Sequence, residues 1–167
     1  LARVDASPVD LEVVLGNLVE ISRQISAKKK SVTIDFVVDR KPGAKVSYIV
    51  NGHDLRIGQI ITNLIENARS FVSQDGGRIV VHLVRQKDRC IVRVEDNGPG
   101  IQAEDIDRIF ERFYTDRPAS EGFGQNSGLG LSISRQIAEA HGGTLKADNI
   151  LDKYGVISGA RFSLSLP

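Results

Sequence analysis

The chain has 167 residues, of which 41% are hydrophobic and 26% charged, enough for one domain with its own core. Its net charge of +1 gives no sign of a nucleic-acid partner, and its single cysteine, Cys90, excludes an internal disulfide and a cysteine-rich zinc site. The longest apolar runs, such as residues 79–84, are too short to span a bilayer and no signal-peptide pattern is present, so we expect no direct membrane contact.

The first half of the chain predicts two helices separated by two short strands. Asp10 is a candidate N-cap for a helix that reaches about Lys28. The apolar face of this helix would consist of Leu11, Val14, Leu15, Leu18, Ile21 and Ile25. Residues 31–38 and 46–50 alternate as strands do, with turns predicted at 40–43 and 51–52. Asp54 can then cap a second helix over about residues 55–71.

The second half predicts a hairpin, two helices and two closing strands. Asp75-Gly76-Gly77 should break the chain before a hairpin of residues 78–86 and 89–96. Residues 103–110 favour a short helix, 114–127 a polar lid, 129–141 a third helix, and 144–147 and 160–166 strands. We therefore expect one α/β (α+β) domain over residues 1–167. It would be a two-layer sandwich with a mixed sheet of about five strands, covered on one face by three helices.

Two asparagines lie on one face of the second predicted helix. Asn63 and Asn67 are four residues apart, so their side chains project in the same direction. Carboxamide oxygens are hard ligands of the kind that Mg²⁺ accepts together with waters and phosphates. Taken alone, the pair is more often simply exposed to solvent. The motifs on either side of it favour a binding role.

A carboxylate and two glycines follow the second strand of the hairpin. Asp96 can only accept hydrogen bonds, so it suits the exocyclic amine of adenine and disfavours the carbonyl that guanine has at that position. Gly98 and Gly100 would let the backbone approach a flat ring, and Pro99 would stiffen the turn. The alternative is an ordinary surface turn of the Asn-Gly type. The binding interpretation predicts ATP in preference to GTP.

Small residues come at or just before the start of the third predicted helix, namely Gly122, Gly124, Ser127, Gly128 and Gly130. Free backbone N–H groups at a helix N-terminus can hold phosphate oxygens, and the helix dipole assists. Neither a Walker nor a Rossmann glycine pattern is present. A separate basic side chain should therefore help, and the candidates are Arg69, Arg112 and Arg117. Each of these could instead form a surface ion pair.

Four segments, in this order, resemble the motifs of the catalytic domain of bacterial sensor histidine kinases. Residues 63–68 resemble its N box, 96–100 its G1 box, 109–114 its F box and 128–131 its G2 box. Residues 159–167 are similar to its last strand, so the resemblance covers nearly the whole chain. From residue 109 onward, the chain most resembles alphaproteobacterial kinases that sense acid or host contact.

The resemblance implies the Bergerat (GHKL) fold, shared with gyrase and MutL ATPases, and the cofactors ATP and Mg²⁺. It places adenine on Asp96 with Phe71 beside it, the metal near Asn63 and Asn67, and Arg112 at the γ-phosphate. The catalytic residues it implies are Asn63, Asn67 and Arg112. The cofactor-binding residues it implies are Asn63, Asn67, Phe71, Asp96, Gly98, Gly100, Ile101, Ser127, Gly128, Leu129, Gly130 and Leu131.

The family's acceptor motif, a histidine followed by an acidic residue, is absent from the chain. The resemblance therefore implies a catalytic domain that phosphorylates a histidine on a separate dimerisation/phosphoacceptor domain and serves a response regulator indirectly. We expect it to be a cytoplasmic part of an inner-membrane sensor kinase, with the dimerisation, sensor and transmembrane regions outside this chain.

The predicted mechanism depends on whether the site has a general base that can activate water. The ATPase relatives carry a glutamate where Asn63 stands, and an amide has no useful basicity near neutral pH. The γ-phosphoryl group of ATP should then survive for transfer to a histidine, although Glu66 could still polarise a group and support slow hydrolysis. The family often has a lysine at the position of Ser70. Here Arg69 is adjacent instead, so the sequence does not decide which side chain contacts phosphate at this place. Three other functions compete: a gyrase- or chaperone-type ATPase, an anti-sigma-type serine kinase, and a non-enzymatic binding module.

Overall fold

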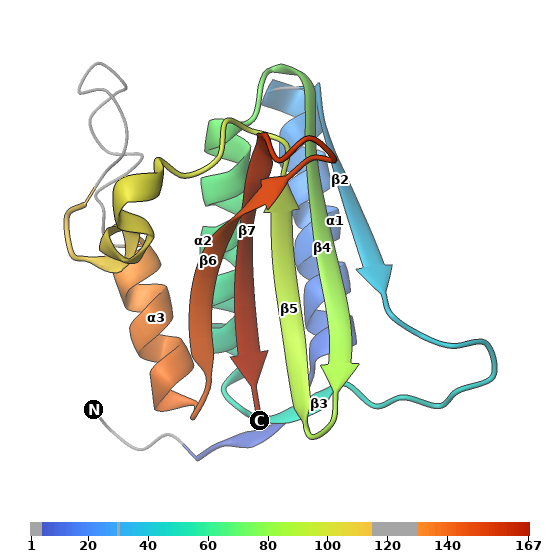
Figure 1. The fold of residues 1–167 in the computed structure, drawn as a ribbon. Helices are drawn as coiled ribbons and strands as arrows, with labels where there is room; N and C mark the ends of the chain where they lie inside the picture. The colour runs from blue at the N-terminus through green and yellow to red at the C-terminus, as the bar shows by residue number, and fades with distance from the viewer. Residues whose placement is uncertain (1–4, 30, 115–129) are drawn as a thin grey trace.

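The computed structural model describes residues 5–29, 31–114 and 130–167 (Figure 1). Its elements are β1 (Ser7–Asp10), α1 (Leu11–Lys29), β2 (Ser31–Val38), β3 (Ile49–Gly52), α2 (Asp54–Phe71), β4 (Asp75–Gln86), β5 (Arg89–Asp96), the 3₁₀ helix η1 (Ala103–Phe110), α3 (Gly130–Ala140), β6 (Thr144–Leu151) and β7 (Ile157–Leu166). The main sheet has the strand order β2-β4-β5-β7-β6, in which β2 is parallel to β4 and the other pairs are antiparallel. β1 and β3 form a separate antiparallel pair.

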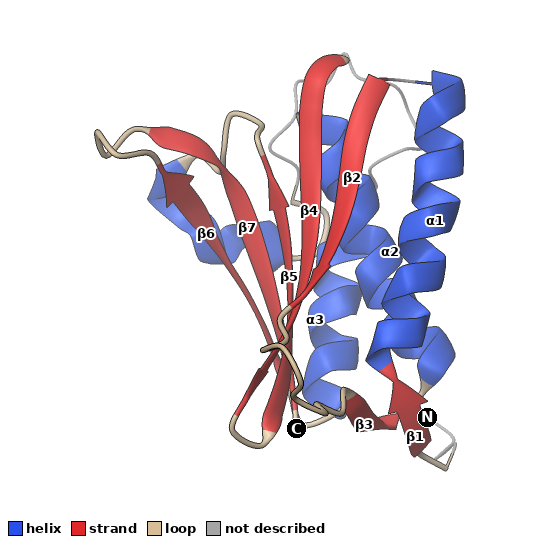
Figure 2. Ribbon diagram, turned by 90° about the vertical axis from the view of Figure 1, so that its right-hand side faces the viewer, coloured by secondary structure: helices blue, strands red, loops and turns tan. Residues whose placement is uncertain are grey.

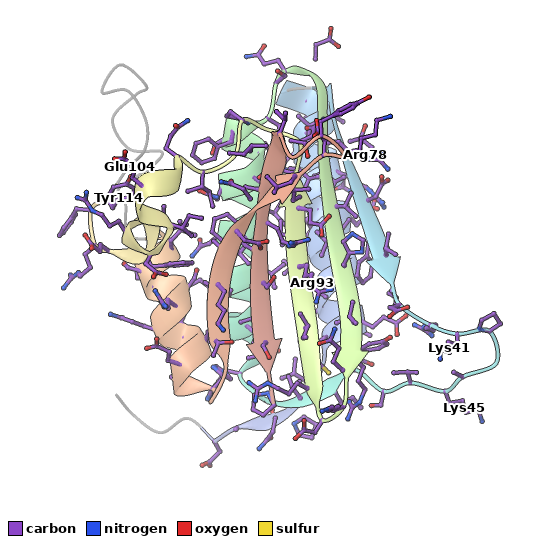
Figure 3. All side chains as sticks on the ribbon, in the orientation of Figure 1. Lys41, Lys45, Arg78, Arg93, Glu104 and Tyr114 are labelled. Atoms are coloured by element: carbon purple, nitrogen blue, oxygen red, sulfur yellow. The ribbon has the colours of Figure 1, made fainter. Side chains whose placement is uncertain are left out.

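The α-helices pack on one face of the sheet and leave the other face open (Figure 2). This two-layer arrangement, with its mixed five-stranded sheet, confirms the predicted fold class. It also explains the alternation in β5, where Cys90, Val92 and Val94 are buried while Arg93 lies on the open face (Figure 3). The open face carries ion pairs across neighbouring strands, including Arg161 with both Asp148 and Glu95.

The hydrophobic core lies between the sheet and the helices, and α2 is the central helix (Figure 1). Its fully buried residues recur at helical spacing because one side of α2 faces the sheet. They are Ile57, Ile60, Ile61, Leu64 and Ile65. Burying five such side chains contributes about 1.5–3 kcal/mol each to folding. Packing of this side fixes the position of α2, so polar side chains elsewhere on its surface are also held at fixed positions.

The predicted apolar face of α1 is wrong in its second half. Ile21 and Ile25 are 53% and 39% exposed, whereas Ser22 and Ser26 are buried. The reason lies in α2, because the buried guanidinium of Arg69 approaches α1 and needs polar partners there. In the second half of α1, the side that faces inward is therefore the one that offers hydrogen-bond acceptors to Arg69, and not the apolar side.

The predicted helix caps have different outcomes. Asp10 is confirmed as a cap, since its Oδ1 accepts hydrogen bonds from the N–H groups of Glu12 and Val13 at 3.1 and 3.4 Å. Asp54 is the first residue of α2, and the N-cap position belongs to His53. The His53 N–H instead donates to Nε2 of His141 at 3.1 Å, which ties the start of α2 to the end of α3.

Several strands extend beyond their predicted ends. Residues 51–52, predicted as a turn, belong to β3, whereas residues 46–48, predicted as strand, lie before it. Residues 75–77, predicted as a break, belong to β4. β6 and β7 also reach closer to each other than predicted, to Leu151 and Ile157. Glycine and polar residues join these strands because a neighbouring strand satisfies their backbone hydrogen bonds. Residues 115–127 of the predicted lid lie outside the described residues.

None of the helices in the described parts of the chain combines the length and apolar character that a membrane crossing requires.

The loop between β2 and β3 extends away from the sheet and carries Lys41 and Lys45 (Figure 3).

Candidate functional site

Three predicted site residues form a line along one side of α2. Asn63, Asn67 and Phe71 recur every four residues, and each is half-buried. Eight residues of helix separate the first from the last, which corresponds to about 12 Å. The two ends of this line contact different parts of the chain. The start of α3 meets the Asn63 end, and the segment that follows β5 meets the Phe71 end.

At the first end, the Asn63 side chain bridges α2 and α3. Its Nδ2 group donates to the Gly130 carbonyl at 3.2 Å and to Ser134 Oγ at 3.0 Å. Gly130 and Asn63 are close neighbours, since a Cβ at position 130 would make an ordinary contact of 3.7 Å with Asn63 Cγ. The structure therefore brings together the asparagine of the predicted N box and the last glycine of the predicted G2 box. Ser134 was not predicted, because a serine inside a helical pattern carries no signal of its own.

At the other end, Asp96 is the last residue of β5 and is only 6% exposed. Its Oδ1 accepts hydrogen bonds from the N–H groups of Gly98 and Ala160, at 2.9 and 3.3 Å. Burial raises the pKa of this carboxyl group above its usual range, while the two backbone N–H groups act in the opposite direction. Within the described residues, Oδ2 takes part in no hydrogen bond, so it can accept one from a ligand.

The glycines after β5 allow the chain to pass close to α2 and β7. A Cβ at Gly98 would lie 3.0 Å from the Phe71 carbonyl oxygen, which places this loop directly against the end of α2. Gly100 has φ of +82°, a conformation that favours glycine. Figure 1 shows the segment continuing over the end of α2 toward η1. Gly98 and Gly100 thus lie in a tightly packed loop, and the approach of a flat ring to their backbone stays a prediction.

A side chain that the sequence did not reveal holds this loop in place. Asn149 of β6 accepts a hydrogen bond from the Ile101 N–H at 2.7 Å and donates one to the Ile101 carbonyl at 2.9 Å. This reciprocal pair fixes the backbone just after Gly100, and the side chain of Ile101 is buried. In the sequence Asn149 is one polar residue of an edge strand, and nothing near it points to this contact.

The remaining predicted residues are only partly placed. Arg112 is exposed after η1, with its guanidinium 5.7 Å from the centre of the Phe113 ring, and no described contact joins it to Asn63 or Asp96. Leu131 is half-buried in the first turn of α3. Five predicted residues of the segment before α3, together with Arg117, lie outside the described residues. They are Gly122, Gly124, Ser127, Gly128 and Leu129.

Arg69 is not available as a phosphate ligand. Its side chain is buried, with Nε donating to Ser26 Oγ at 3.1 Å and Nη2 to the Ser22 carbonyl at 2.8 Å. Nη1 forms an ion pair with Glu66. These contacts turn the guanidinium toward α1. The residue therefore joins the two helices, and the acid of the predicted N box is engaged on that same side.

We expect Arg69→Met to lower the free energy of unfolding by about 2–4 kcal/mol, because the substitution leaves the buried Ser22 carbonyl and Ser26 hydroxyl without their partner. Urea denaturation measures the change. The control is Arg78→Met, which removes an exposed ion pair with Asp35 and should cost less than about 1 kcal/mol. Equal effects of the two substitutions would contradict a role for Arg69 in joining α1 to α2.

The described residues contain no group of three or more histidine, cysteine, aspartate or glutamate side chains able to hold a metal. A magnesium ion at the line of α2 side chains would therefore depend on amide oxygens, waters and ligand phosphates. That is the coordination Mg²⁺ prefers when it accompanies a nucleotide. Asn63 fits such a role, since both hydrogens of its Nδ2 have acceptors and its Oδ1 is left to coordinate.

Comparisons with known proteins identify relatives of this chain. A family model for histidine kinase-, DNA gyrase B- and HSP90-like ATPases matches residues 52–167. Sensor protein ChvG of Agrobacterium fabrum is 81% identical over all 167 residues, which span only 28% of its length. The solved mycobacterial sensor histidine kinase MprB is 26% identical with a TM-score of 0.77, over 97% of each chain.

A second similar structure was solved with a bound ligand. Full-length ShkA in complex with AMPPNP is 25% identical, with a TM-score of 0.74 over 97% of this chain and 31% of that one.

Proposed function

This chain belongs to the family of histidine kinase-, DNA gyrase B- and HSP90-like ATPases, and on that premise we propose that it binds Mg-ATP and transfers the γ-phosphoryl group to a histidine on a separate dimerisation/phosphoacceptor domain. The resemblance to sensor histidine kinase catalytic domains, read from the four boxes, is confirmed by the match to ChvG. The observation that supports the proposal most is that predicted site residues on one side of α2 contact both the start of α3 and the loop after β5.

In this proposal the nucleotide lies along α2 with its base at the Phe71 end and its phosphates at the Asn63 end. The free Oδ2 of Asp96 accepts a hydrogen bond from the adenine amine, and Gly98 lets the loop after Asp96 pack closely against the end of α2. The N-terminus of α3 begins at Gly130, beside Asn63, where its dipole favours phosphate. The AMPPNP in the ShkA complex supports a nucleotide site in this fold.

The metal would be held by the amide oxygens of Asn63 and Asn67 together with phosphate oxygens and waters. When bound, magnesium neutralises charge that develops on the transferred phosphoryl group. The chain's own contribution is to position the triphosphate and to leave water without a strong base. Asn63 supplies an amide at the point where a base would act, and Glu66 is paired with Arg69 toward α1.

The partners follow from the same proposal. The acceptor histidine belongs to a dimerisation/phosphoacceptor domain of the same kinase, and a response regulator receives the phosphoryl group from that histidine. We place the domain in the cytoplasm, where ATP is supplied, as part of an inner-membrane sensor kinase. No contact with nucleic acid or with the membrane is assigned to these residues. Arg112 remains the proposed cation for the γ-phosphate.

The test mixes the chain with γ-labelled ATP, Mg²⁺ and a separately produced dimerisation fragment of the same kinase. We expect label on the fragment that is lost in acid and stable in base, as phosphohistidine is, together with slow phosphate release. A fragment with its acceptor histidine changed to glutamine serves as the control. Rapid hydrolysis without labelled fragment would favour the ATPase alternative, and acid-stable label would favour the serine kinase.

A further inference from the structure

Ser134 is a buried polar residue in the second turn of α3, with no exposed surface. Its hydroxyl oxygen lies 3.0 Å from Asn63 Nδ2, one helical turn beyond the Gly130 carbonyl that accepts from the same group. None of the four sequence boxes includes it. A buried hydroxyl that contacts a proposed metal ligand can determine how that ligand is oriented.

The Gly130 carbonyl decides which atom of the Asn63 amide faces α3. A backbone carbonyl can only accept a hydrogen bond, so the amide must present its NH₂ group there. The reverse orientation would place two oxygens against each other at a half-buried position, which is costly. An NH₂ group has two hydrogens, and Ser134 Oγ accepts the second one. The Asn63 oxygen is thus the atom left for a ligand.

The Gly130 contact alone does not fix the plane of the amide. The terminal torsion of asparagine has a broad energy minimum, so one hydrogen bond allows the carboxamide to swing about its contact atom. A second acceptor, displaced along α3 by one turn, defines the plane and with it the direction of Oδ1. Since Ser134 is on a packed helix and fully buried, its own position varies little.

We propose that Ser134 is a positioning residue for the metal-bound triphosphate: its hydroxyl fixes the plane of the Asn63 carboxamide and with it the direction in which the amide oxygen faces the metal. The inference rests on the proposed function and adds a residue to it. It predicts that loss of the hydroxyl weakens the contribution of magnesium to nucleotide binding, while binding of the base is unchanged. A purely structural hydroxyl would affect stability alone.

The experiment measures the affinity of the chain for ATP by calorimetric titration, once with Mg²⁺ and once with EDTA. For Ser134→Ala we expect the gain in affinity that Mg²⁺ provides to fall by about tenfold, the usual effect of removing a group that orients a metal ligand. The affinity in EDTA should stay within about twofold of the parent. Ser134→Cys, similar in volume but a poor acceptor, should behave like alanine, and Ser134→Thr should restore the magnesium effect.

The matched control is Ser26→Ala on α1. Ser26 is 2% exposed and also accepts a hydrogen bond from a side chain, Arg69 Nε at 3.1 Å. It should lose stability but keep the full magnesium effect. If Ser134→Ala and Ser134→Cys keep that effect while the parent shows it, the positioning role is overturned and the proposed function stands. If the parent itself shows no magnesium effect, the metal part of the proposed function fails and this inference fails with it.

Discussion

Replacing Asp96 by asparagine will weaken ATP binding by about a hundredfold or more and will raise the thermal stability of the nucleotide-free domain. Asparagine keeps one oxygen to accept from the Gly98 and Ala160 N–H groups, so the loop after β5 should stay in place. Its NH₂ group then occupies the position of Oδ2 and meets the adenine amine, donor against donor. A buried polar pair left unsatisfied in this way accounts for discrimination of that size.

The gain in stability follows from the pKa of Asp96. Burial raises this pKa in the folded state, which means that folding favours the protonated form. The contribution of Asp96 to stability is therefore greatest at low pH and is lost as the pH rises through the folded-state pKa. Because asparagine carries no charge, the melting temperature of the variant should exceed that of the parent at neutral pH, and the difference should close in acid.

Nucleotide titration at neutral pH checks the first part, and thermal unfolding followed from acid to neutral pH checks the second. Asp148→Asn is the control, because Asp148 is exposed on the open face of the sheet and pairs with Arg161. It should leave ATP affinity unchanged. An Asp96→Asn domain that binds ATP as the parent does would show that this carboxylate does not recognise adenine.

A second large effect is expected from Gly159→Ala in β7. A Cβ at this position would lie 1.8 Å from the carbonyl oxygen of Asp96 and 2.9 Å from its carbonyl carbon. Both are backbone atoms, so no rotamer change can relieve the clash and β5 or β7 must move. We expect a loss of about 3 kcal/mol or more in the free energy of unfolding. For a domain of this size that corresponds to a fall of roughly 6–12 °C in melting temperature.

The same substitution should weaken ATP binding, since the displaced residue is Asp96 itself. Gly58→Ala in α2 is the matched control, because its Cβ would only make ordinary contact with Leu18 at 3.9 Å. Alanine inside a helix should stabilise by about 0.5–1 kcal/mol. Thermal unfolding with and without ATP measures both variants. A Gly159→Ala domain as stable as the parent would mean that β5 and β7 are less closely packed than the structure indicates.

Local patterns predicted the elements that depend on residues near one another in the chain. The spacing of Asn63 and Asn67 predicted that they share one side of a helix, and the alternation in residues 89–96 predicted a strand that ends at Asp96. Asp10 was a correct cap for the same reason, because its partners are two and three residues away. The order of the boxes added the family, which the comparisons confirm.

Contacts between distant segments were beyond such patterns. Ile21 and Ile25 on α1 are exposed, against expectation, because the serines of that helix face the buried guanidinium of Arg69 on α2. Ser134 and Asn149 acquired their roles only when folding brought them to Asn63 and Ile101. Neither residue differs in the sequence from an ordinary polar position in a helix or strand.

The order of residues is enough to identify the side chains that this protein can offer to a nucleotide: an acid after a strand, two amides one helical turn apart, and glycines where the backbone must come close. Periodicity and backbone conformation are short-range properties, so they can be read from neighbouring residues. Which partners hold those side chains, and which of their atoms stay free, depends on how the helices and strands pack together. Hydrogen bonds between α2 and α3 and between β6 and the loop after β5 join residues 48 to 71 positions apart, and such pairings exist only once the helices have packed on the sheet.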